Sequence, residues 1–239
     1  MIIKLPETES TNKYLNKLTK NQELKNKTIV ITDIQTNGKG QHNNYWESEP
    51  YKNLTFSIFY KNINLDVNKQ FYISIAVSLG ITDFLKKINI NPKIKWPNDI
   101  YVNNKKICGI LIENNIFKTT IKSTIIGIGL NVNQTKFTEL TKNATSIKLI
   151  TNKNYELNKL FNLLINNIDN NINTLIKKDF ISLKSNYLNN MYLINKTHTF
   201  KIKNTKLIAK IKGIEDTGQL IVVDKNNNIN KYFLKEIIF

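Results

Sequence analysis

Apolar positions recur with helical spacing in three parts of the chain. Residues 11–18 present a small apolar face, and Ser10 or Thr11 can cap the start of this segment. Residues 71–88 are apolar on most of their turns, which is typical of a buried helix. Residues 155–178 carry one continuous apolar stripe with polar residues elsewhere. The pattern therefore predicts three helices.

Short runs rich in β-branched and aromatic residues predict strands between the helices. These runs cover residues 27–34, 53–60, 93–96, 100–102, 106–113 and 121–133. Two of them are separated by a short polar stretch that contains Asn103 and Asn104, which predicts a tight hairpin turn. Strands that alternate irregularly with helices indicate an α+β domain, with a mixed β-sheet covered by packed helices.

The pattern changes near residue 195. From there on the chain shows only short strand-like runs, at 199–203, 206–214, 219–223 and 229–238. Polar turn residues separate them. We therefore predict two domains: an α+β domain over residues 1–194 and a small C-terminal β-barrel over residues 195–239.

The composition is strongly basic in an unusual way. The 239 residues include 35 Lys and no Arg against 18 Asp and Glu, which gives a formal charge of +17. Asn and Ile are abundant together with Lys, as an AT-rich coding sequence would produce in any protein. Nucleic-acid surfaces generally use Arg for bidentate contacts. The charge therefore indicates either background composition on solvated faces or an anionic partner such as a nucleotide or an acidic protein.

Other features limit the class of protein. A hydrophobic content of 41% excludes a disordered basic tail. No apolar run reaches the ~18 residues of a membrane span, and the first residues lack the apolar core of a secretion signal. A lone cysteine, Cys108, excludes an intramolecular disulfide and a cysteine-rich zinc module. We predict a cytoplasmic globular protein that does not bind membranes.

A long polar loop over residues 35–49 contains Gly38, Lys39 and Gly40. Loops of this length are usually functional or disordered. The glycines fit no Walker A motif, because that motif needs glycine where Asp33 stands and Ser or Thr at Gly40. Backbone N–H groups between glycines can nevertheless hold a phosphate. The loop is thus either a surface turn or a ligand-binding loop.

Two further clusters carry candidate chemistry. The run Lys95-Trp96-Pro97-Asn98-Asp99 precedes a hairpin that should bring Asp99 close to Lys106. Such a pair can bind an anionic substrate with its Mg²⁺, or it can be an ordinary surface ion pair. In the run 127–133, Gly127 and Gly129 interrupt a strand, which indicates either close approach by a ligand or core packing beneath a bulge.

Taken in order, these motifs resemble the biotin protein ligase family. They are Glu9-Ser10-Thr11-Asn12, Gln35 to Gln41 with Trp46-Glu47-Ser48, Asn53-Leu54, Lys95 to Asp99, Lys105-Lys106 with Gly109 to Glu113, Gly127 to Asn133, and the end of the chain from Gly213. The resemblance covers almost the whole chain. It implies a class II synthetase-like catalytic domain followed by an SH3-like domain.

The resemblance also implies an activity. Members of the family activate biotin with ATP and Mg²⁺ to biotinyl-5′-adenylate. They then acylate one lysine of the biotin carboxyl carrier domain of acetyl-CoA carboxylase or a related carboxylase. This chain is thus expected to be a biotin–protein ligase, acting as a monomer or a homodimer in post-translational protein biotinylation.

By the same resemblance, Ser10, Thr11 and Asn12 would line the biotin pocket and Gln35 would contact the biotin rings. Residues Gly38, Lys39, Gly40 and Gln41 would form a loop that closes over the adenylate. Trp46 would close the adenine side. Lys106 would neutralise the carboxylate–phosphate centre, and Asp99 would position the reacting groups and the metal. Gly109 and Asn131 would shape the wall of the nucleotide site.

This sequence departs from the family pattern in the loop. The family typically has arginines and a further glycine where this chain has Lys39, Gln41, His42 and Asn43. Lysine lacks the planar fork of arginine, so we hypothesise faster loss of the adenylate.

Four alternatives remain at this point. A DNA-binding repressor is disfavoured, because only nine residues precede the ligase pattern and leave no room for a helix-turn-helix domain, so no specific DNA is expected. A lipoate or octanoyl ligase shares the architecture, and a non-catalytic biotin-binding module would fit the loop changes. An acyl-cysteine mechanism at Cys108 is disfavoured, because its apolar neighbours indicate a buried, inert thiol.

Overall fold

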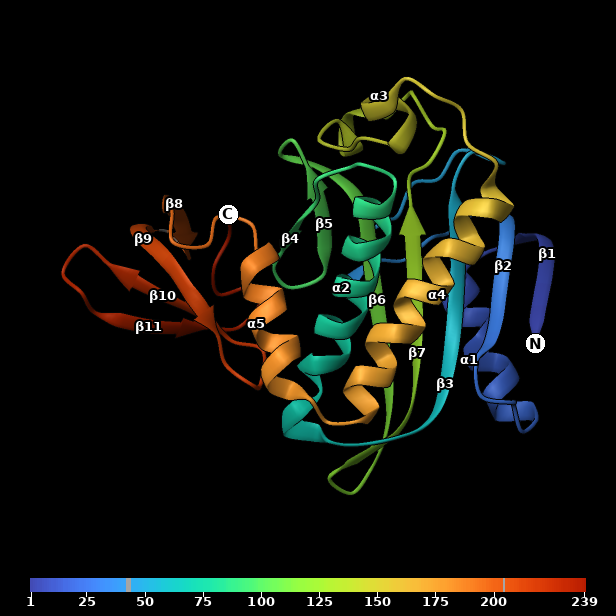
Figure 1. Cartoon of the computed structure of the whole chain (residues 1–239), viewed down its shortest axis with the longest axis horizontal. Helices are drawn as coiled ribbons and strands as arrows, with labels where there is room; N and C mark the ends of the chain where they lie inside the picture. Colours follow the sequence, from blue (N-terminus) through green and yellow to red (C-terminus); the bar gives the residue numbers. More distant parts are fainter. Residues whose placement is uncertain (42–43, 204) are drawn as a thin grey trace.

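Seven strands form one mixed sheet in the order β1-β2-β3-β7-β6-β5-β4 (Figure 1). The computed structural model describes residues 1–41, 44–203 and 205–239. Only β1 and β2 are parallel; every other neighbouring pair is antiparallel. The strands are β1 (Ile2–Thr8), β2 (Thr28–Gln35), β3 (Leu54–Asp66), β4 (Lys93–Lys95), β5 (Asp99–Val102), β6 (Lys105–Phe117) and β7 (Thr120–Leu130). The predicted α+β fold with a mixed sheet is confirmed.

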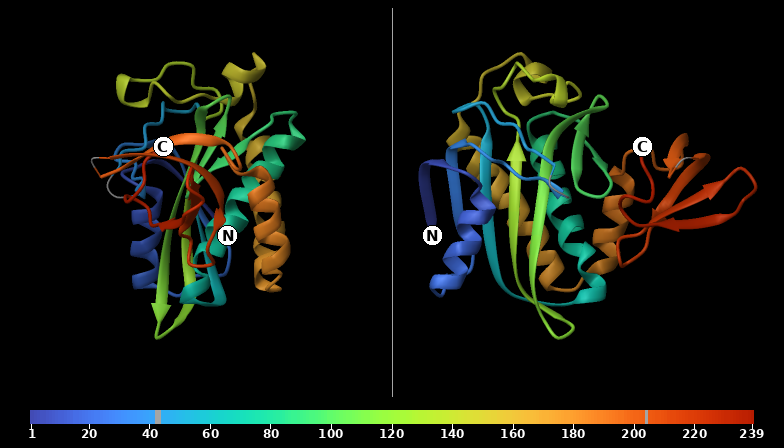
Figure 2. Two further views of the ribbon diagram at one scale, coloured as in Figure 1. Left: turned by 90° about the vertical axis from the view of Figure 1, so that its left-hand side faces the viewer. Right: turned by 180° about the vertical axis from the view of Figure 1, so that it is seen from behind.

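Helices cover both faces of this sheet. They are α1 (Thr11–Asn21), α2 (Phe71–Lys87), α3 (Ile147–Thr151), α4 (Leu157–Ile176) and α5 (Phe180–Asn190). Figure 2 shows α1 alone on one face, with α2, α4 and α5 on the other. None of the helices in the described ranges is both long and apolar enough to cross a membrane.

The strands bury alternate residues against the two helix layers. Val30, Phe59 and Ile125 pack with Leu15 of α1 in a small cluster. Their immediate neighbours in sequence turn to the opposite face and join the main core with α2 and α4. This period of two is what a sheet covered on both sides requires. It explains why the central strands read as nearly continuous apolar runs.

A second sheet lies beside α5 and the β4 edge of the large sheet (Figure 1). It contains β8 (Thr197–Ile202), β9 (Thr205–Ile214), β10 (Leu220–Asp224) and β11 (Ile229–Tyr232), all antiparallel, in the order β11-β10-β9-β8. The prediction of a single strand over 229–238 is wrong, because β11 ends at Tyr232. The chain then turns, and Ile238 forms an isolated bridge with Lys201.

Local sequence signals placed several boundaries correctly. Ser10 caps α1, since its Oγ accepts a hydrogen bond from the Lys13 N–H. Asn103 and Asn104 form the β5–β6 turn with φ values of 49° and 63°, the left-handed conformation that a tight hairpin turn needs. The strand β1 was not predicted, because Pro6 interrupts a short run of mixed polarity; proline is tolerated there because β1 is an edge strand.

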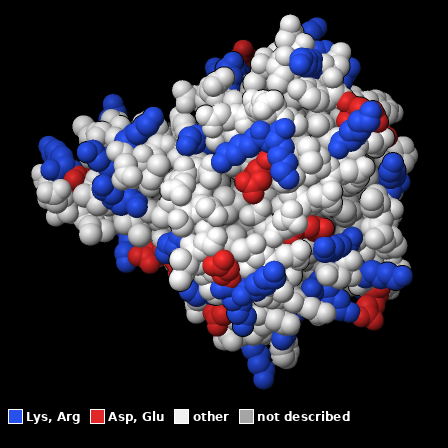
Figure 3. Space-filling model, in the orientation of Figure 1, with Lys and Arg blue, Asp and Glu red and all other residues white. Residues whose placement is uncertain are grey.

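Lysine side chains are scattered over the face of the molecule seen in Figure 3 and alternate with acidic groups. They extend over both sheets and do not gather into one stripe on this face. A nucleic-acid-binding protein normally concentrates its basic residues on one surface. On this face the distribution therefore favours background composition as the origin of the charge.

Candidate functional site

A cavity of about 550 Å³ opens where the ends of several strands meet the long loop and the C-terminal segment. Its walls come from the start of α1, the end of β2, loop residues 39–41 and 44–46, the β4–β5 turn, parts of β6 and β7, and residues 234, 235 and 237–239. The fold thus brings together all the sequence motifs that carried candidate chemistry. A volume of this size suits a ligand as large as a nucleotide.

Glycines form the floor of this cavity. Gly109 on β6 stands opposite Gly129 on β7, and the ladder is regular on both sides of them. A methyl group on Gly129 would collide with the Trp46 indole, and one on Gly127 would collide with the Asn12 side chain. The strand is therefore not bulged at these glycines, but the expectation of close packing on them is confirmed, because protein side chains lie against both. The glycines let a tryptophan and an amide lie directly on the sheet.

A buried chain of hydrogen bonds runs beneath one wall. Gln35 Oε1 accepts from the Thr11 N–H at 3.0 Å, and Ser57 Oγ lies 2.7 Å from Thr11 Oγ1 and 2.5 Å from Asn12 Oδ1. Asn12 Nδ2 donates to Glu113 Oε2 at 2.8 Å. The Ser57 hydroxyl donates to Thr11 Oγ1, and the Thr11 hydroxyl in turn donates to Gln35 Oε1 at 3.4 Å; Ser57 Oγ is also within donating distance of the Asn12 amide oxygen, which can only accept.

The direction of these hydrogen bonds leaves the side-chain donor of Gln35 available to a ligand. With its oxygen held by Thr11, the Gln35 amide presents its Nε2 donors. Gly38 makes room for them, because a Cβ there would lie 2.5 Å from Gln35 Nε2. A ligand with a carbonyl acceptor would complete this arrangement.

Ser57 and Glu113 in this network are functional candidates that the sequence did not single out as such. Ser57 lies in the apolar run of β3, and only its polarity inside a buried strand could have drawn attention to it.

Lys106 and Asp99 form the second polar feature. Lys106 Nζ lies 2.7 Å from Asp99 Oδ1, which confirms that the hairpin brings the two together. About 33% of the lysine side chain and 22% of the aspartate side chain are exposed, so the pair lies inside the cavity wall and not on an open surface. Lys106 Nζ also stands 5.5 Å from the centre of the Trp46 ring, within cation–π distance.

The cavity is electrostatically positive. Lys39, Lys95 and Lys235 line it in addition to Lys106. Among the described lining residues, Asp99 carries the only side-chain carboxylate. Charges of one sign inside a concave wall concentrate a field on an oppositely charged ligand. The arrangement suits a ligand with phosphate or carboxylate groups.

Among the described lining residues, two buried side-chain polar atoms have neither a hydrogen-bond partner nor an ion-pair partner. Trp46 Nε1 and Gln41 Oε1 are buried and have no hydrogen-bond partner within the described parts of the chain. Buried polar groups are nearly always satisfied in folded proteins. A donor and an acceptor left open beside one cavity are therefore positioned for a ligand.

Nearly all of the predicted site residues line this cavity. The lining ones are Ser10, Thr11, Asn12, Gln35, Lys39, Gly40, Gln41, Trp46, Asp99, Lys106 and Gly109. Gly38 lies behind Gln35, and Asn131 is buried outside the lining with its Nδ2 bonded to the Thr145 carbonyl at 3.0 Å. His42 and Asn43 lie outside the described residues.

The cavity has one wall that was not predicted as part of the site, because the end of the chain was assigned only to the small C-terminal domain. Residues 234, 235 and 237–239 form this wall. Cys108, by contrast, is fully buried in the main core, and burial raises the pKa of its thiol far above the ordinary value. This confirms the expectation of a buried thiol.

Comparisons with known proteins support a common assignment. Residues 5–131 match the model of the "Biotin/lipoate A/B protein ligase family". The bifunctional ligase/repressor BirA of Bacillus subtilis is 28% identical over 232 residues, which cover 95% of this chain and 70% of that protein. The biotin--[acetyl-CoA-carboxylase] ligase of Mycobacterium tuberculosis is 28% identical over 123 residues, or 50% of this chain and 44% of that protein.

A solved structure has the same fold over nearly its full length. The biotin protein ligase of Aquifex aeolicus in complex with biotin and ATP superposes with a TM-score of 0.80. The two sequences are 26% identical, and the match covers 99% of this chain and 97% of that one.

Proposed function

Because the chain belongs to the biotin/lipoate A/B protein ligase family, we propose that it is a biotin–protein ligase. It activates biotin with ATP to biotinyl-5′-adenylate and transfers the biotinyl group to a lysine of the carrier protein of a carboxylase. The observation that carries this proposal is the positive, glycine-floored cavity in which the Lys106–Asp99 pair faces Trp46.

In this site the buried hydrogen-bond chain would hold the biotin end. The ureido ring of biotin has one carbonyl acceptor flanked by two N–H donors. The Gln35 Nε2 group is placed to donate to such an acceptor, with Thr11 and Asn12 fixed beside it by Ser57. The Trp46 indole, which lies on Gly109 and Gly129 and lines the cavity, would offer an apolar face to the aliphatic tail.

Lys106 would act at the reacting centre. In the first step the biotin carboxylate attacks the α-phosphorus of ATP, the new C–O–P linkage forms, and pyrophosphate leaves. Negative charge on the phosphoryl oxygens increases during this step, and a fixed ammonium group stabilises it. Asp99 holds Lys106 in place before substrate arrives. Next, the neutral amine of the carrier lysine attacks the acyl carbon and the C–O bond to the phosphate breaks. AMP leaves with the electron pair of that bond, and the nitrogen releases a proton to solvent, which leaves an amide.

Mg²⁺ fits this site only as an ion bound mainly by the nucleotide. No group of three His, Cys, Asp or Glu side chains in the described ranges is arranged to hold a metal. Magnesium commonly binds through substrate phosphates, waters and one or two carboxylates. Asp99 is the side chain that would complete such a set. When bound, the ion would neutralise phosphate charge.

We also propose that residues 1–194 form the catalytic domain and residues 195–239 an SH3-like domain. The large sheet ends with β7 and the second sheet begins with β8, which supports this division. The protein is expected to act in the cytoplasm, where its carboxylase partner would be.

A transfer assay tests the proposed function. The purified chain is incubated with ATP, Mg²⁺, labelled biotin and a biotin carrier domain, and label on the carrier is counted. We expect biotin transfer, little transfer of labelled lipoate to a lipoyl domain, and loss of adenylate formation in Lys106→Ala. Transfer of lipoate but not biotin, or near-normal turnover in Lys106→Ala, would contradict the proposal.

A further inference from the structure

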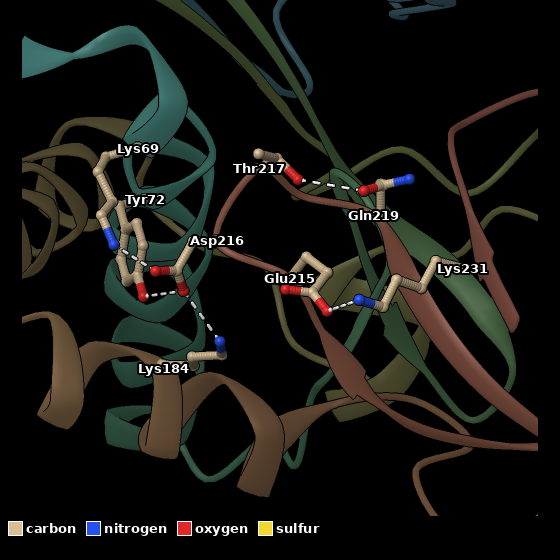
Figure 4. Close-up of polar contacts among 8 residues, drawn as sticks. All are labelled: Lys69, Tyr72, Lys184, Glu215, Asp216, Thr217, Gln219 and Lys231. Atoms are coloured by element: carbon tan, nitrogen blue, oxygen red, sulfur yellow. Dashed lines mark hydrogen bonds and ion pairs between the residues drawn. The ribbon is translucent and has the colours of Figure 1, made fainter. Parts of the chain in front are cut away.

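The Asp216 carboxylate, in the turn between β9 and β10, bonds to side chains on and next to the helices α2 and α5. Figure 4 shows Asp216 at the centre of three polar side chains from three segments. Asp216 accepts from Tyr72 Oη at 2.8 Å and pairs with Lys184 Nζ at 2.9 Å, and Lys69 binds its second oxygen. Tyr72 is on α2, Lys184 is on α5, and Lys69 just precedes α2. We name this group the Asp216 latch.

The Asp216 carboxyl at the centre of the latch is ionised at ordinary pH. The hydrogen bonds from Lys69 and Lys184 hold the pKa of the Asp216 carboxyl well below its usual range. Lys69 is itself held over the rings of Tyr72 and Phe180, at 5.6 and 5.4 Å from their centres. Isolated surface ion pairs contribute little, but a carboxylate that binds three donors at once fixes a geometry.

The same turn touches the wall of the cavity. The Gly218 carbonyl accepts a hydrogen bond from Trp96 Nε1 at 2.8 Å, and Trp96 lines the cavity. Gly218 has φ of +96°, and the Phe71 ring lies so close that a Cβ would meet Phe71 Cγ at 2.7 Å. Only glycine satisfies both conditions at this position. The turn is therefore seated on α2 and on the β4–β5 connection together.

The C-terminal segment depends on the sheet that the turn holds. Lys201 of β8 and Ile238 exchange two backbone hydrogen bonds of 2.9 Å. The Phe239 ring packs edge-on against Phe200, with centroids 5.4 Å apart, and lies under Lys95 Nζ at 5.1 Å. Residues 234–239 are thus placed against the cavity by β8 and by Lys95. A shift of the second sheet would move this wall.

We propose that Asp216 is a positioning residue for the reaction: it keeps the C-terminal sheet seated so that residues 234–239 close one side of the cavity over the acyl-adenylate. Asp216 itself is not among the residues that line the cavity. The proposal rests on the proposed function, because it assumes that an adenylate must be retained between two steps. A mixed anhydride that escapes is hydrolysed in water instead of reaching the carrier.

The test compares Asp216→Asn with Glu215→Gln as a matched control. Glu215 is the neighbouring residue, and within the described parts of the chain its carboxylate pairs with Lys231 of the second sheet, at 2.7 Å (Figure 4). For each variant, pyrophosphate release and biotin transfer are measured together. We expect Asp216→Asn to release about fivefold more pyrophosphate per biotin transferred. A factor of this size corresponds to the free energy that a part-exposed ion pair contributes. Asp216→Glu should restore part of the coupling, and Glu215→Gln should match the wild type.

Amide hydrogen exchange tests the role of the Asp216 latch without a measurement of catalysis. We expect faster amide exchange at residues 234–239 in Asp216→Asn than in Glu215→Gln. If the wild type transfers no biotin, the proposed function fails, yet this exchange difference still tests the latch. Unchanged exchange together with an unchanged coupling ratio in folded Asp216→Asn would overturn the proposal. If Asp216→Asn does not fold, the double variant Lys69→Met, Lys184→Met takes its place, and wild-type coupling in that variant would overturn the proposal equally.

Discussion

Replacing Ser57 by alanine removes one hydroxyl from the centre of the hydrogen-bond chain beneath the cavity. Ser57 is fully buried and Asn12 is 5% exposed, so water cannot replace the lost group easily. The substitution removes the hydroxyl donor that Asn12 Oδ1 and Thr11 Oγ1 share. The change is small in volume, so its effect comes from the unsatisfied polar atoms.

The magnitude follows from that cost. A buried acceptor left without a partner costs about 1–3 kcal/mol. In a chain of this length each kcal/mol lowers Tm by roughly 2–4 °C. We therefore expect Ser57→Ala to melt about 2–12 °C lower than the wild type. Biotin affinity should fall about tenfold, because roughly 1.4 kcal/mol of the positioning of Thr11 and Asn12 is lost.

The assay combines thermal unfolding with biotin titration by calorimetry. Ser78→Ala is the matched control, because Ser78 is equally buried, in α2, and its hydroxyl has no hydrogen-bond partner among the described residues. That variant should keep its Tm and its biotin affinity. The reasoning is refuted if Ser57→Ala binds biotin as tightly as the wild type, or if Ser78→Ala loses as much stability as Ser57→Ala.

Three further predictions follow from the site and the latch. Gly129→Ala should displace the Trp46 indole, since the new methyl group would come within 2.6 Å of Trp46 Cζ2. Tryptophan emission should then shift, and biotin affinity should fall about tenfold. The control Gly213→Ala should behave as wild type, because no neighbouring atom lies nearer than 4.0 Å to the new methyl group. Iodoacetamide should label Cys108 in urea but not in the native protein, as mass spectrometry would show; rapid native labelling would contradict the burial of the thiol. The pKa of Asp216 is lower in the folded than in the unfolded state, so the stability that Asp216 contributes is present above the unfolded pKa of ~3.9 and is lost as pH falls toward the folded pKa. The free energy of unfolding of Asp216→Asn should therefore change less with pH below about pH 4 than that of the wild type. Parallel pH dependences for the two proteins would count against this.

The sequence predicted those parts of the fold that depend on local patterns. Apolar periodicity located α2 and α4, and the paired asparagines located the β5–β6 turn, because these signals act over a few residues. The helices α3 and α5 were not predicted. The helix α5 buries only Leu183 and Tyr187 fully, so its sequence shows no clear apolar stripe.

The sequence predicted the parts of the candidate site that consist of short motifs. It did not predict the parts that form where segments distant in the sequence meet. The glycines of β6 and β7 and the Lys106–Asp99 pair were visible as short motifs. The wall formed by residues 234–239 was not, because it depends on how β8 is seated beside β4. The Asp216 latch joins residues more than 140 positions apart in its longest contact, and no spacing rule connects them.

The absence of arginine acquires a structural meaning in the cavity. Lysine is a flexible point charge, so a site built on lysine must restrain it by other means. Lys106 is held between Asp99 and the Trp46 ring, and Lys95 lies over two rings, 4.9 Å from the centre of Tyr101 and 5.1 Å from that of Phe239. Aromatic faces thus take over part of the orienting role that the fork of arginine would supply.

Lys39 in the loop is exposed and lacks such a ring among the described contacts. Loss of the adenylate through the loop side is therefore expected to exceed loss past Lys95 and Lys106. A Lys39→Arg variant should slow adenylate release, whereas arginine at position 95 should not, because Lys95 is already held. Equal off-rates for Lys39→Arg and the wild type, measured by chasing labelled adenylate with unlabelled biotin and ATP, would show that the loop lysine does not limit retention.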